Sequence, residues 1–249
     1  MAGHSKFKNI MHRKGAQDKK RAKIFSRLGR EISVAVKEGG PDPEKNIRLR
    51  SAVGSAKSLN MPKDNIERAI KKGEGNDPDS NYEEVRYEGY GPEGVAIIVE
   101  ALTNNKNRTA AEVRSSFSKY GGNLGETGSV SFGFKRLGSI ILNKSNINEE
   151  ELFDFIVENG SEDYEINDDE YNIYCDQKIL HQLNQKIIEK FGQTNFTGLI
   201  WKSENEITVS KDKADTLFKL LNILEENEDV QAVSSNFDVS DEVLASLTA

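Results

Sequence analysis

The N-terminal stretch from Ala2 to Arg30 concentrates side chains that bind phosphate. It holds ten Lys or Arg residues and one acid, Asp18, in a chain of 249 residues whose formal net charge is −7. Lysine and arginine neutralise phosphates, and aromatic or imidazole rings between them can stack on unpaired bases. The pattern predicts nucleic-acid contact through His4, Lys6, Phe7, His12, Arg13, Lys14, Lys19, Lys20, Arg21, Lys23, Arg27 and Arg30.

This stretch divides into an arm and the start of a helix. Residues 2–16 contain only three large apolar side chains, too few to offset the entropy of ordering, so we expect a mobile arm. From Gln17 onward the spacing predicts a helix, with bases on the side opposite its apolar arc. That basic side either binds a polyanion or is simply solvated; its near absence of acids favours binding. The apolar arc contains Ile24, Phe25, Leu28, Ile32, Ala35 and Val36.

Other residues that could do chemistry do not form a recognisable active site. His4, His12 and His181 are scattered without the acids or cysteines of a metal site, so no metal, cofactor or catalytic residue is expected. The glycine-rich run 121–128 lacks the ending of a P-loop and follows a helix, which favours turns. Cys175 lies in an apolar strand and is expected in the core, and the carboxylates of 149–169 are expected to form a solvated acidic face.

Composition indicates a soluble globular protein, with 36% hydrophobic and 30% charged residues. No apolar run approaches the ~20 residues of a membrane span, and the N-terminus lacks the apolar region of a secretion signal. We therefore expect a cytoplasmic protein, which the single cysteine fits.

Charge is divided unevenly along the chain, because residues 1–75 hold 19 bases and 8 acids whereas the remaining residues hold 15 bases and 33 acids. A polyanion is attracted to one end and repelled by the other.

Periodicity and turn residues predict an α+β multidomain protein. Three helices come first, the second capped by Asp42 and the third ending at Gly73, followed by a linker at 75–80. The predicted later strands are 85–90, 95–102, 129–134, 139–142, 163–166, 171–175, 197–202 and 229–237, and the later helices are 108–120, 149–159, 178–191 and 211–226.

Within this order, the elements from 139 to 202 read βαββαβ, the ferredoxin-like pattern. We predict a basic arm plus three-helix domain at 1–77, a discontinuous α+β middle domain at 78–136 and 204–249, and a ferredoxin-like domain at 137–203 inserted in it. Two consecutive small domains are the alternative that spacing leaves open.

Several segments of the chain together form a recognisable pattern, and they are 2–6, 9–10, 12–14, 18–21, 30–32, 60–72, 87–92, 94–96, 99–103, 107–109 and 128–130. These segments resemble the YebC/PmpR family, which includes the mitochondrial translational activator of cytochrome oxidase. Phe7 stands where that family usually has Trp, so a stacking ring is kept but the indole donor is lost. Asn104 stands where Asp is common. Ser5 and Asn9 lie in matching segments and complete the predicted contact set.

The resemblance implies a three-domain, non-enzymatic, cytoplasmic regulator of gene expression. Family members are labelled DNA-binding transcriptional regulators, and others are associated with the ribosome and relief of stalling in translation. The implied partners are DNA or ribosomal or transfer RNA, and the ribosome, with no membrane and no small-molecule substrate. Two hypotheses from other classes stay open: a protein-interaction adaptor whose acidic domains bind basic partners, and an enzyme.

Overall fold

The structure is a computed structural model that describes residues 17–75, 81–145, 147–167, 169–240 and 243. It divides the chain into two compact units. The first unit combines Met1–Phe134 with Ser203–Ala249, and the second is Lys135–Lys202. The predicted arm and most of the predicted linker lie outside the described residues.

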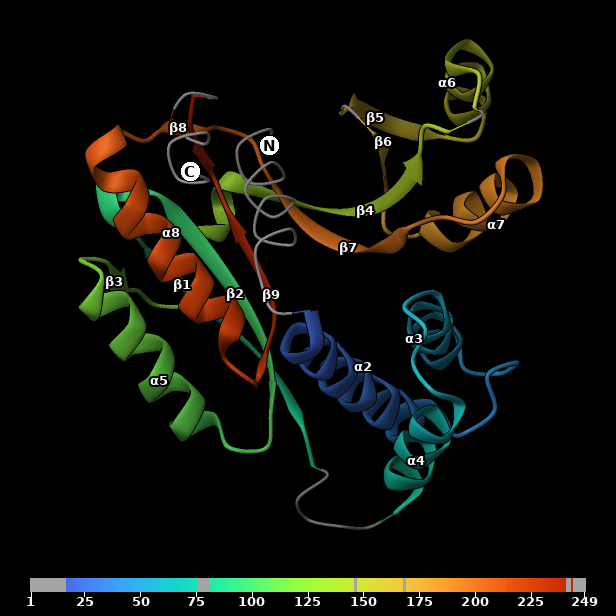
Figure 1. The fold of residues 1–249 in the computed structure, drawn as a ribbon, viewed down its shortest axis with the longest axis horizontal. Coiled ribbons are helices and arrows are strands. Elements are labelled where there is room, and N and C mark those ends of the chain that lie inside the picture. Colours follow the sequence, from blue (N-terminus) through green and yellow to red (C-terminus); the bar gives the residue numbers. More distant parts are fainter. Residues whose placement is uncertain (1–16, 76–80, 146, 168, 241–242, 244–249) are drawn as a thin grey trace. The chain divides into compact units, whose positions relative to one another are not determined.

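The first unit begins with three helices, α2 (Gln17–Gly39), α3 (Ile47–Ser58) and α4 (Lys63–Glu74). The predicted apolar arc of α2 is confirmed where the core forms, because Ile32, Ala35 and Val36 are buried. Figure 1 shows α2 packed beside both other helices. The core is completed from α3, α4 and the turn between them by Leu49, Ala52, Ala56, Met61, Ile66 and Ala69.

Two predicted helix ends differ from the structure. The cap of α3 is Asn46, whose side chain accepts from Leu49 N at 3.0 Å and donates to Ala35 O at 2.6 Å. Asp42, the predicted cap, instead belongs to the preceding turn, where its carbonyl accepts from Lys45 and Asn46. Gly73 does not end α4, which continues to Glu74. It lies against α2, and a Cβ built there meets Ser33 O at 2.5 Å.

These contacts predict opposite effects for two helical glycines. Gly73→Ala forces α4 away from α2 and is expected to lower the free energy of unfolding by about 1–3 kcal/mol. Gly54→Ala, in α3, has nothing within 4 Å of the new Cβ and is expected to raise it by about 0.5–1 kcal/mol. Urea unfolding of both variants tests this pair. Equal effects would contradict the close approach at Gly73.

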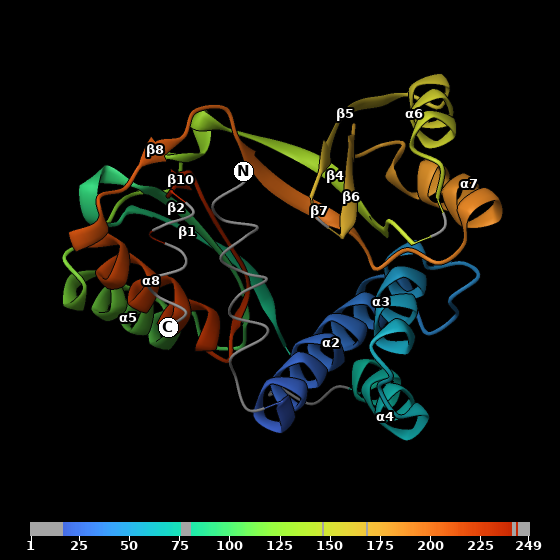
Figure 2. The same ribbon diagram turned by 45° about the horizontal axis from the view of Figure 1, so that its top comes forward.

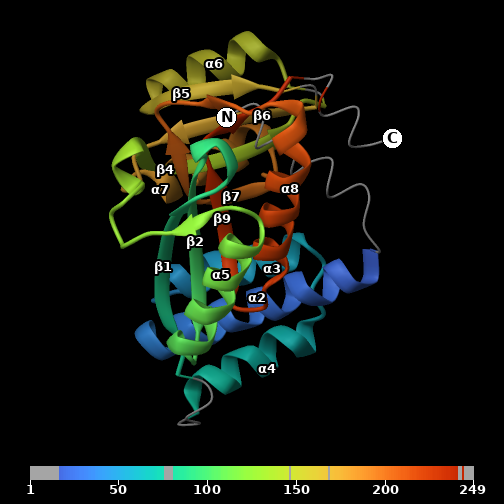
Figure 3. The same cartoon turned by 90° about the vertical axis from the view of Figure 1, so that its left-hand side faces the viewer.

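The rest of the first unit is built on an antiparallel sheet in the order β3-β1-β2-β9. Figure 3 shows α5 and α8 on the same side of this sheet. Alternate residues of β2, including Ile97, Val99 and Ala101, share a core with both helices. The elements are β1 (Glu83–Tyr90), β2 (Ala96–Thr103), α5 (Lys106–Lys119), β3 (Asn123–Leu124), α8 (Lys211–Glu226) and β9 (Val230–Ser235).

The predicted strand at 229–237 is divided in two by Asn236. Strand β9 ends before this residue, and β10 (Phe237–Asp238) pairs in parallel with β8 (Ile207–Thr208), a short strand absent from the prediction. The Asn236 side chain accepts from Ala96 N at 2.8 Å, while its carbonyl accepts from Ile207 N at 2.8 Å. One residue thus joins both sheets of the first unit.

The predicted strand at 129–134 is wrong over most of its length. Residues Ser131–Gly133 form a short 3-10 helix, η3, and only Phe134 belongs to a strand. The cause is the buried carboxylate of Glu88, which accepts from Val130 N at 3.0 Å and from Ser131 N at 2.9 Å. Burial raises the pKa of Glu88, but these amides and Arg86 outweigh that effect and the pKa lies below its usual value. The amides therefore bind a side chain rather than a neighbouring strand.

We expect Glu88→Gln to lower the free energy of unfolding by about 1–3 kcal/mol. The substitution weakens two charge-assisted hydrogen bonds and removes the negative charge that lies 2.8 Å from Arg86 Nε. Urea unfolding measures the loss. Hydrogen exchange at the amides of Val130 and Ser131 should accelerate in the same variant, and unchanged exchange would contradict the assigned role.

The second unit contains a four-stranded sheet in the order β5-β6-β4-β7. Figure 2 shows α6 and α7 on one side of it, and their apolar residues share a core with Ile140, Leu142 and Ile173. The helices and sheets of both units confirm the predicted α+β class and the helical N-terminal region. The elements are β4 (Phe134–Asn143), α6 (Glu149–Glu158), β5 (Ser161–Ile166), β6 (Glu170–Cys175), α7 (Leu180–Phe191) and β7 (Phe196–Ser203).

Candidate nucleic-acid interface

The predicted contact residues fall into three groups in the structure. The first group lies outside the described residues, and the second, Lys19 and Lys20, lies on the first turn of α2. The third group, Arg21, Lys23, Arg27 and Arg30, follows along the same helix. The first group contains His4, Ser5, Lys6, Phe7, Asn9, His12, Arg13 and Lys14.

The start of α2 presents bases in two environments. Arg21 is exposed, and its guanidinium carbon lies 5.5 Å from the centroid of the Phe25 ring, a cation–π contact that orients it. Lys23 is half-buried. Burial, together with the positive charge of Arg27, lowers the pKa of Lys23 to about 8, against the opposing effect of nearby glutamates. A phosphate placed here would favour the charged form of Lys23.

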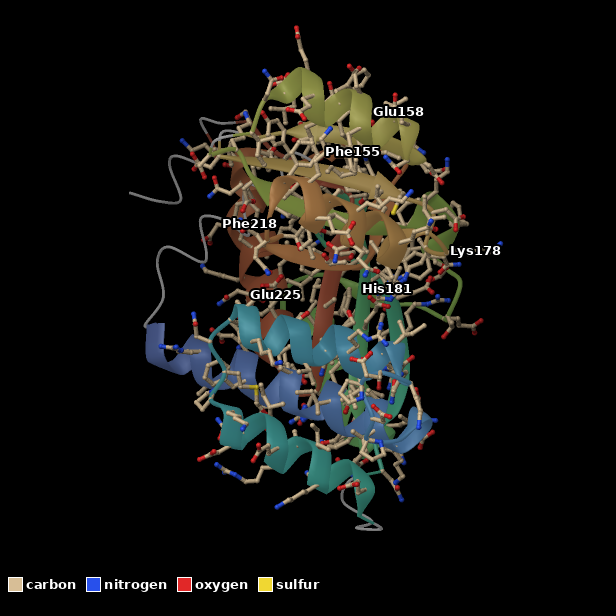
Figure 4. All side chains as sticks on the ribbon, turned by 90° about the vertical axis from the view of Figure 1, so that its right-hand side faces the viewer. Phe155, Glu158, Lys178, His181, Phe218 and Glu225 are labelled. Atoms are coloured by element: carbon tan, nitrogen blue, oxygen red, sulfur yellow. The ribbon has the colours of Figure 1, made fainter. Side chains whose placement is uncertain are left out.

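The next two arginines contact α8 and the turn that follows it, which corrects the expectation of a free basic face. Arg27 donates to the carbonyl of Glu225, and Arg30 donates to the carbonyl of Glu228. Figure 1 shows the corresponding end of α8 beside α2, and Figure 4 marks Glu225 on that helix. A helix C-terminus carries partial negative charge and carbonyls without helical partners, so it attracts guanidinium groups. The basic side of α2 is therefore divided between solvent and the acidic turn 225–229.

Asp229 is the centre of this contact. Its side chain is 4% exposed and lies 3.1 Å from Arg30 Nη1 and 2.6 Å from Arg108 Nη2. The hydroxyls of Thr103 and Thr109 donate to Asp229 Oδ2 at 3.0 and 2.7 Å. One carboxylate thereby links α2, β2, α5 and the turn after α8. Burial raises the pKa of Asp229, but these donors outweigh it and the pKa lies below its usual value.

A polar pocket of about 370 Å³ opens beside this carboxylate, lined by residues that include Arg30, Tyr82, Arg108 and Glu228. Arg30 and Lys72 both approach the Tyr82 ring, at 5.7 and 5.3 Å from its centroid. The lining mixes both signs of charge, because Asp229 and Glu228 stand among the bases. The pocket is therefore a poor match for a polyanion by itself.

The remaining sequence candidates have structural roles. Cys175 is buried, as predicted for a core residue, and burial raises the pKa of its thiol to about 11. In the glycine-rich run, Gly121 and Gly128 have φ angles of +72° and +93°, as turns require. Among the described residues, no group of three or more His, Cys, Asp and Glu side chains is placed to hold a metal ion. Their helices also include none with the length and apolar character to cross a membrane.

Comparison with known proteins agrees with this architecture. The family model described as the TACO1/YebC protein N-terminal domain matches residues 5–76. The model described as the TACO1/YebC second and third domain matches residues 82–237. The chain belongs to the TACO1/YebC family. The resemblance stated from the sequence is thereby confirmed.

A solved structure of a conserved hypothetical protein from Aquifex aeolicus is similar to this TACO1/YebC chain throughout. The two are 44% identical and superpose with a TM-score of 0.83, and the match covers 90% of this chain and 93% of that one. The shared architecture therefore includes both the helical region and the α+β elements.

Sequence reasoning about this TACO1/YebC chain missed the Asp229 cluster. Thr103, Thr109 and Asp229 are ordinary residues in a chain with many polar side chains, and 120 positions separate the last two. The sequence contains one indication of this cluster. Asp229 lies after a helix and directly before an apolar strand, a position where an acid can anchor the connection between the two elements. Nothing in the spacing indicates that Arg30 and Arg108 both reach it.

Proposed function

We propose that this chain is a non-enzymatic, nucleic-acid-binding regulator of gene expression. The observation that carries the proposal is the concentration of ten bases against one acid between Ala2 and Arg30, in a chain that is otherwise acidic. Such a segment binds phosphates by releasing counterions, and the acidic remainder orients the approach of a polyanion. Membership of the TACO1/YebC family supports a regulatory role.

In this proposal the arm and the first turns of α2 are the primary contact. Arg21 is exposed for such a contact. Arg27 and Arg30 contribute only when phosphate oxygens replace their present acceptors on the turn 225–229. The proposed set is His4, Ser5, Lys6, Phe7, Asn9, His12, Arg13, Lys14, Lys19, Lys20, Arg21, Lys23, Arg27 and Arg30.

Structured RNA, such as ribosomal or transfer RNA, is the target that we favour over promoter DNA. Phe7, His4 and His12 stand among the bases of the arm, where rings stack best on unpaired bases. A reader of duplex DNA instead places a helix or ribbon in the major groove. The proposal has two versions: regulation of transcription by binding promoter DNA, and regulation of translation by relieving ribosome stalling.

Ribosome co-sedimentation beside duplex-DNA binding, both measured across a salt series, separates these versions. We expect the protein to sediment with ribosomes at low salt and to be released as salt rises, while random duplex DNA binds more weakly. Tighter, sequence-dependent binding to duplex DNA would favour transcription. Binding to neither would remove the proposal.

We further propose a three-domain organisation in the cytoplasm. The proposed domains are 1–77, then 78–136 with 204–249, and an inserted ferredoxin-like domain at 137–203. The sheet order β5-β6-β4-β7 and the compact unit Lys135–Lys202 support the inserted domain, and the names of the two matching family models imply three domains. The single, buried Cys175 fits a reducing compartment.

The second candidate function is a protein-interaction adaptor. A specific observation favours it, because the segment from Ser145 to Gln177 contains twelve acids and no Lys, Arg or His. A surface of this kind attracts basic proteins and repels nucleic acid. Adaptor and nucleic-acid functions are compatible, since they use different segments of the chain.

A further inference from the structure

Four apolar side chains form a surface along the seam between α6 and β5. Phe153 and Val157 lie one turn apart on α6 and are 41% and 54% exposed. Tyr164 and Ile166 are two positions apart on β5, so both lie on the side of the sheet that the helices cover. Ile166 is 43% exposed. The rings of Phe153 and Tyr164 lie 5.3 Å apart, which joins the two elements. We call these four residues the α6–β5 seam.

The seam lies at a boundary of the sheet. Strand β5 is the first strand in the order β5-β6-β4-β7, so one edge of it faces away from β6. Edge strands are common docking positions for an extended segment of another protein, with apolar side chains filling neighbouring pockets. Helix α6 beside this edge supplies the apolar wall.

Acids surround the seam on its solvent side. At about 100° per residue, Glu150, Asp154 and Glu158 follow directly after Phe153 and Val157 around α6. All three are exposed, and Figure 4 marks Glu158 on this helix. The bases that reach α6, Lys186 and Lys190, come from α7 and contact Asn159 and Glu151. At about 100° per residue, Asn159 lies about 160° and Glu151 about 120° around α6 from Val157, so Lys190 contacts the far border of the acidic side, next to Glu158.

Charge decides which class of partner fits. A nucleic acid at the seam would bring phosphates against carboxylates, with no base from residues 145–177 to neutralise them. A second copy of this chain would bring the same acids face to face. A polypeptide with apolar side chains and flanking Lys or Arg satisfies both the apolar surface and its rim.

We propose that the α6–β5 seam is a docking surface for a basic, apolar-rich segment of a partner protein. The apolar residues supply the affinity, and the carboxylates speed the encounter and select positive charge. The proposal does not depend on nucleic-acid binding by the N-terminal arm, because all its contacts lie within the second unit.

Site-specific photo-crosslinking in cells tests the proposal with the full-length chain. Benzoylphenylalanine is placed at Val157 and, as a matched control, at Gln182, an exposed position of α7. We expect a light-dependent protein product at position 157 that is absent at 182, with a net positive contact peptide that contains apolar residues. Crosslinks to nucleic acid or to a second copy, or equal products at both positions, would overturn the proposal.

The contact peptide is then synthesised and titrated against purified protein. We expect the variant with both Phe153→Ser and Val157→Ser to bind it about 30-fold more weakly, and Gln182→Ser to bind it unchanged. The variant Asp154→Lys with Glu158→Lys changes only exposed residues and should also weaken binding, more strongly at low salt. Thermal unfolding of each variant checks the fold. Unchanged affinity in the charge-reversal variant would contradict the predicted basic partner.

Nucleic-acid binding is measured in parallel, so that a failure of the docking proposal can be distinguished from a failure of the proposed nucleic-acid binding by the arm. A variant with a neutralised arm should keep the Val157 crosslink, and the seam variants should keep their affinity for RNA. Loss of the crosslink in the arm variant would show that the partner is recruited through nucleic acid, against the seam.

Discussion

Asp229→Ala is expected to lower the free energy of unfolding by about 3–5 kcal/mol. The substitution removes the anion that faces Arg30 and Arg108 and deprives two buried hydroxyls of their acceptor. Removing one partner of a buried ion pair has effects of this size because the remaining charge, here that of Arg30 with a 14% exposed side chain, is largely shielded from solvent; Arg108 is 48% exposed and contributes less. Urea unfolding at neutral pH measures the change.

Asp215→Ala is the matched control. Asp215 also pairs with a base, Lys219, at 2.6 Å, but this pair is exposed on the surface of α8. We expect no measurable shift in its urea midpoint, because solvent screens exposed pairs. A loss for Asp229→Ala no larger than that of the control would contradict a central role for the cluster.

The same carboxylate predicts a direction for the pH dependence of stability. The pKa of Asp229 is lower in the folded protein than its ordinary value, because hydrogen bonds from Arg108, Thr109 and Thr103 outweigh the effect of burial. Its contribution is therefore complete above about pH 4, the ordinary aspartate pKa, and is lost as pH falls through the folded value. Asp229→Asn should make the acid side of the stability curve shallower. An unchanged acid limb would contradict the assigned shift.

Neutralising Lys6, Arg13, Lys14 and Lys20 to Gln is expected to remove most nucleic-acid affinity. If each base releases one counterion, the slope of log affinity against log salt becomes shallower by about 3 to 4. With an unchanged value at 1 M salt, affinity at 0.1 M falls by about a thousandfold to ten-thousandfold. Fluorescence anisotropy with a labelled structured RNA across a salt series gives both quantities.

The control for this variant changes the same number of bases elsewhere. Lys119, Lys178, Lys211 and Lys213 are exposed and lie on or beside other helices, and their replacement by Gln removes an equal formal charge. We expect the control to keep nearly the full slope. Equal losses in both variants would show that net charge, rather than the arm, governs binding, and would favour the adaptor function.

The helices were predictable from sequence because their apolar residues repeat with helical spacing over many turns. The periodicity predicted the start of α2 at Gln17 and both ends of α8 as they are observed. At two places, side-chain hydrogen bonds override the structure that the local sequence pattern predicts. Asn46 caps α3 in place of Asp42 because its amide also donates to Ala35 O, a tertiary contact that propensity cannot show. Residues 129–133 alternate like a strand, yet the distant carboxylate of Glu88 binds their amides.

The candidate interface was predictable in composition but not in arrangement. A run of bases is visible in any sequence, whereas the acceptors of Arg27 and Arg30 lie 198 or more positions further along the chain. Helical spacing showed which bases share a side of α2, but not that part of this side packs against α8. The α6–β5 seam is also not visible in the sequence, because its acids have the pattern of a solvated face and its exposed apolar residues have the pattern of core residues.

The most direct test of the account is ultraviolet crosslinking of the full-length protein to nucleic acid in cells, with the crosslinked peptides identified by mass spectrometry. We expect crosslinks within residues 2–30 and none within 145–177, and sequencing of the attached nucleic acid should return ribosomal or transfer RNA. Crosslinks confined to the acidic segment, or an arm without any crosslink, would contradict it.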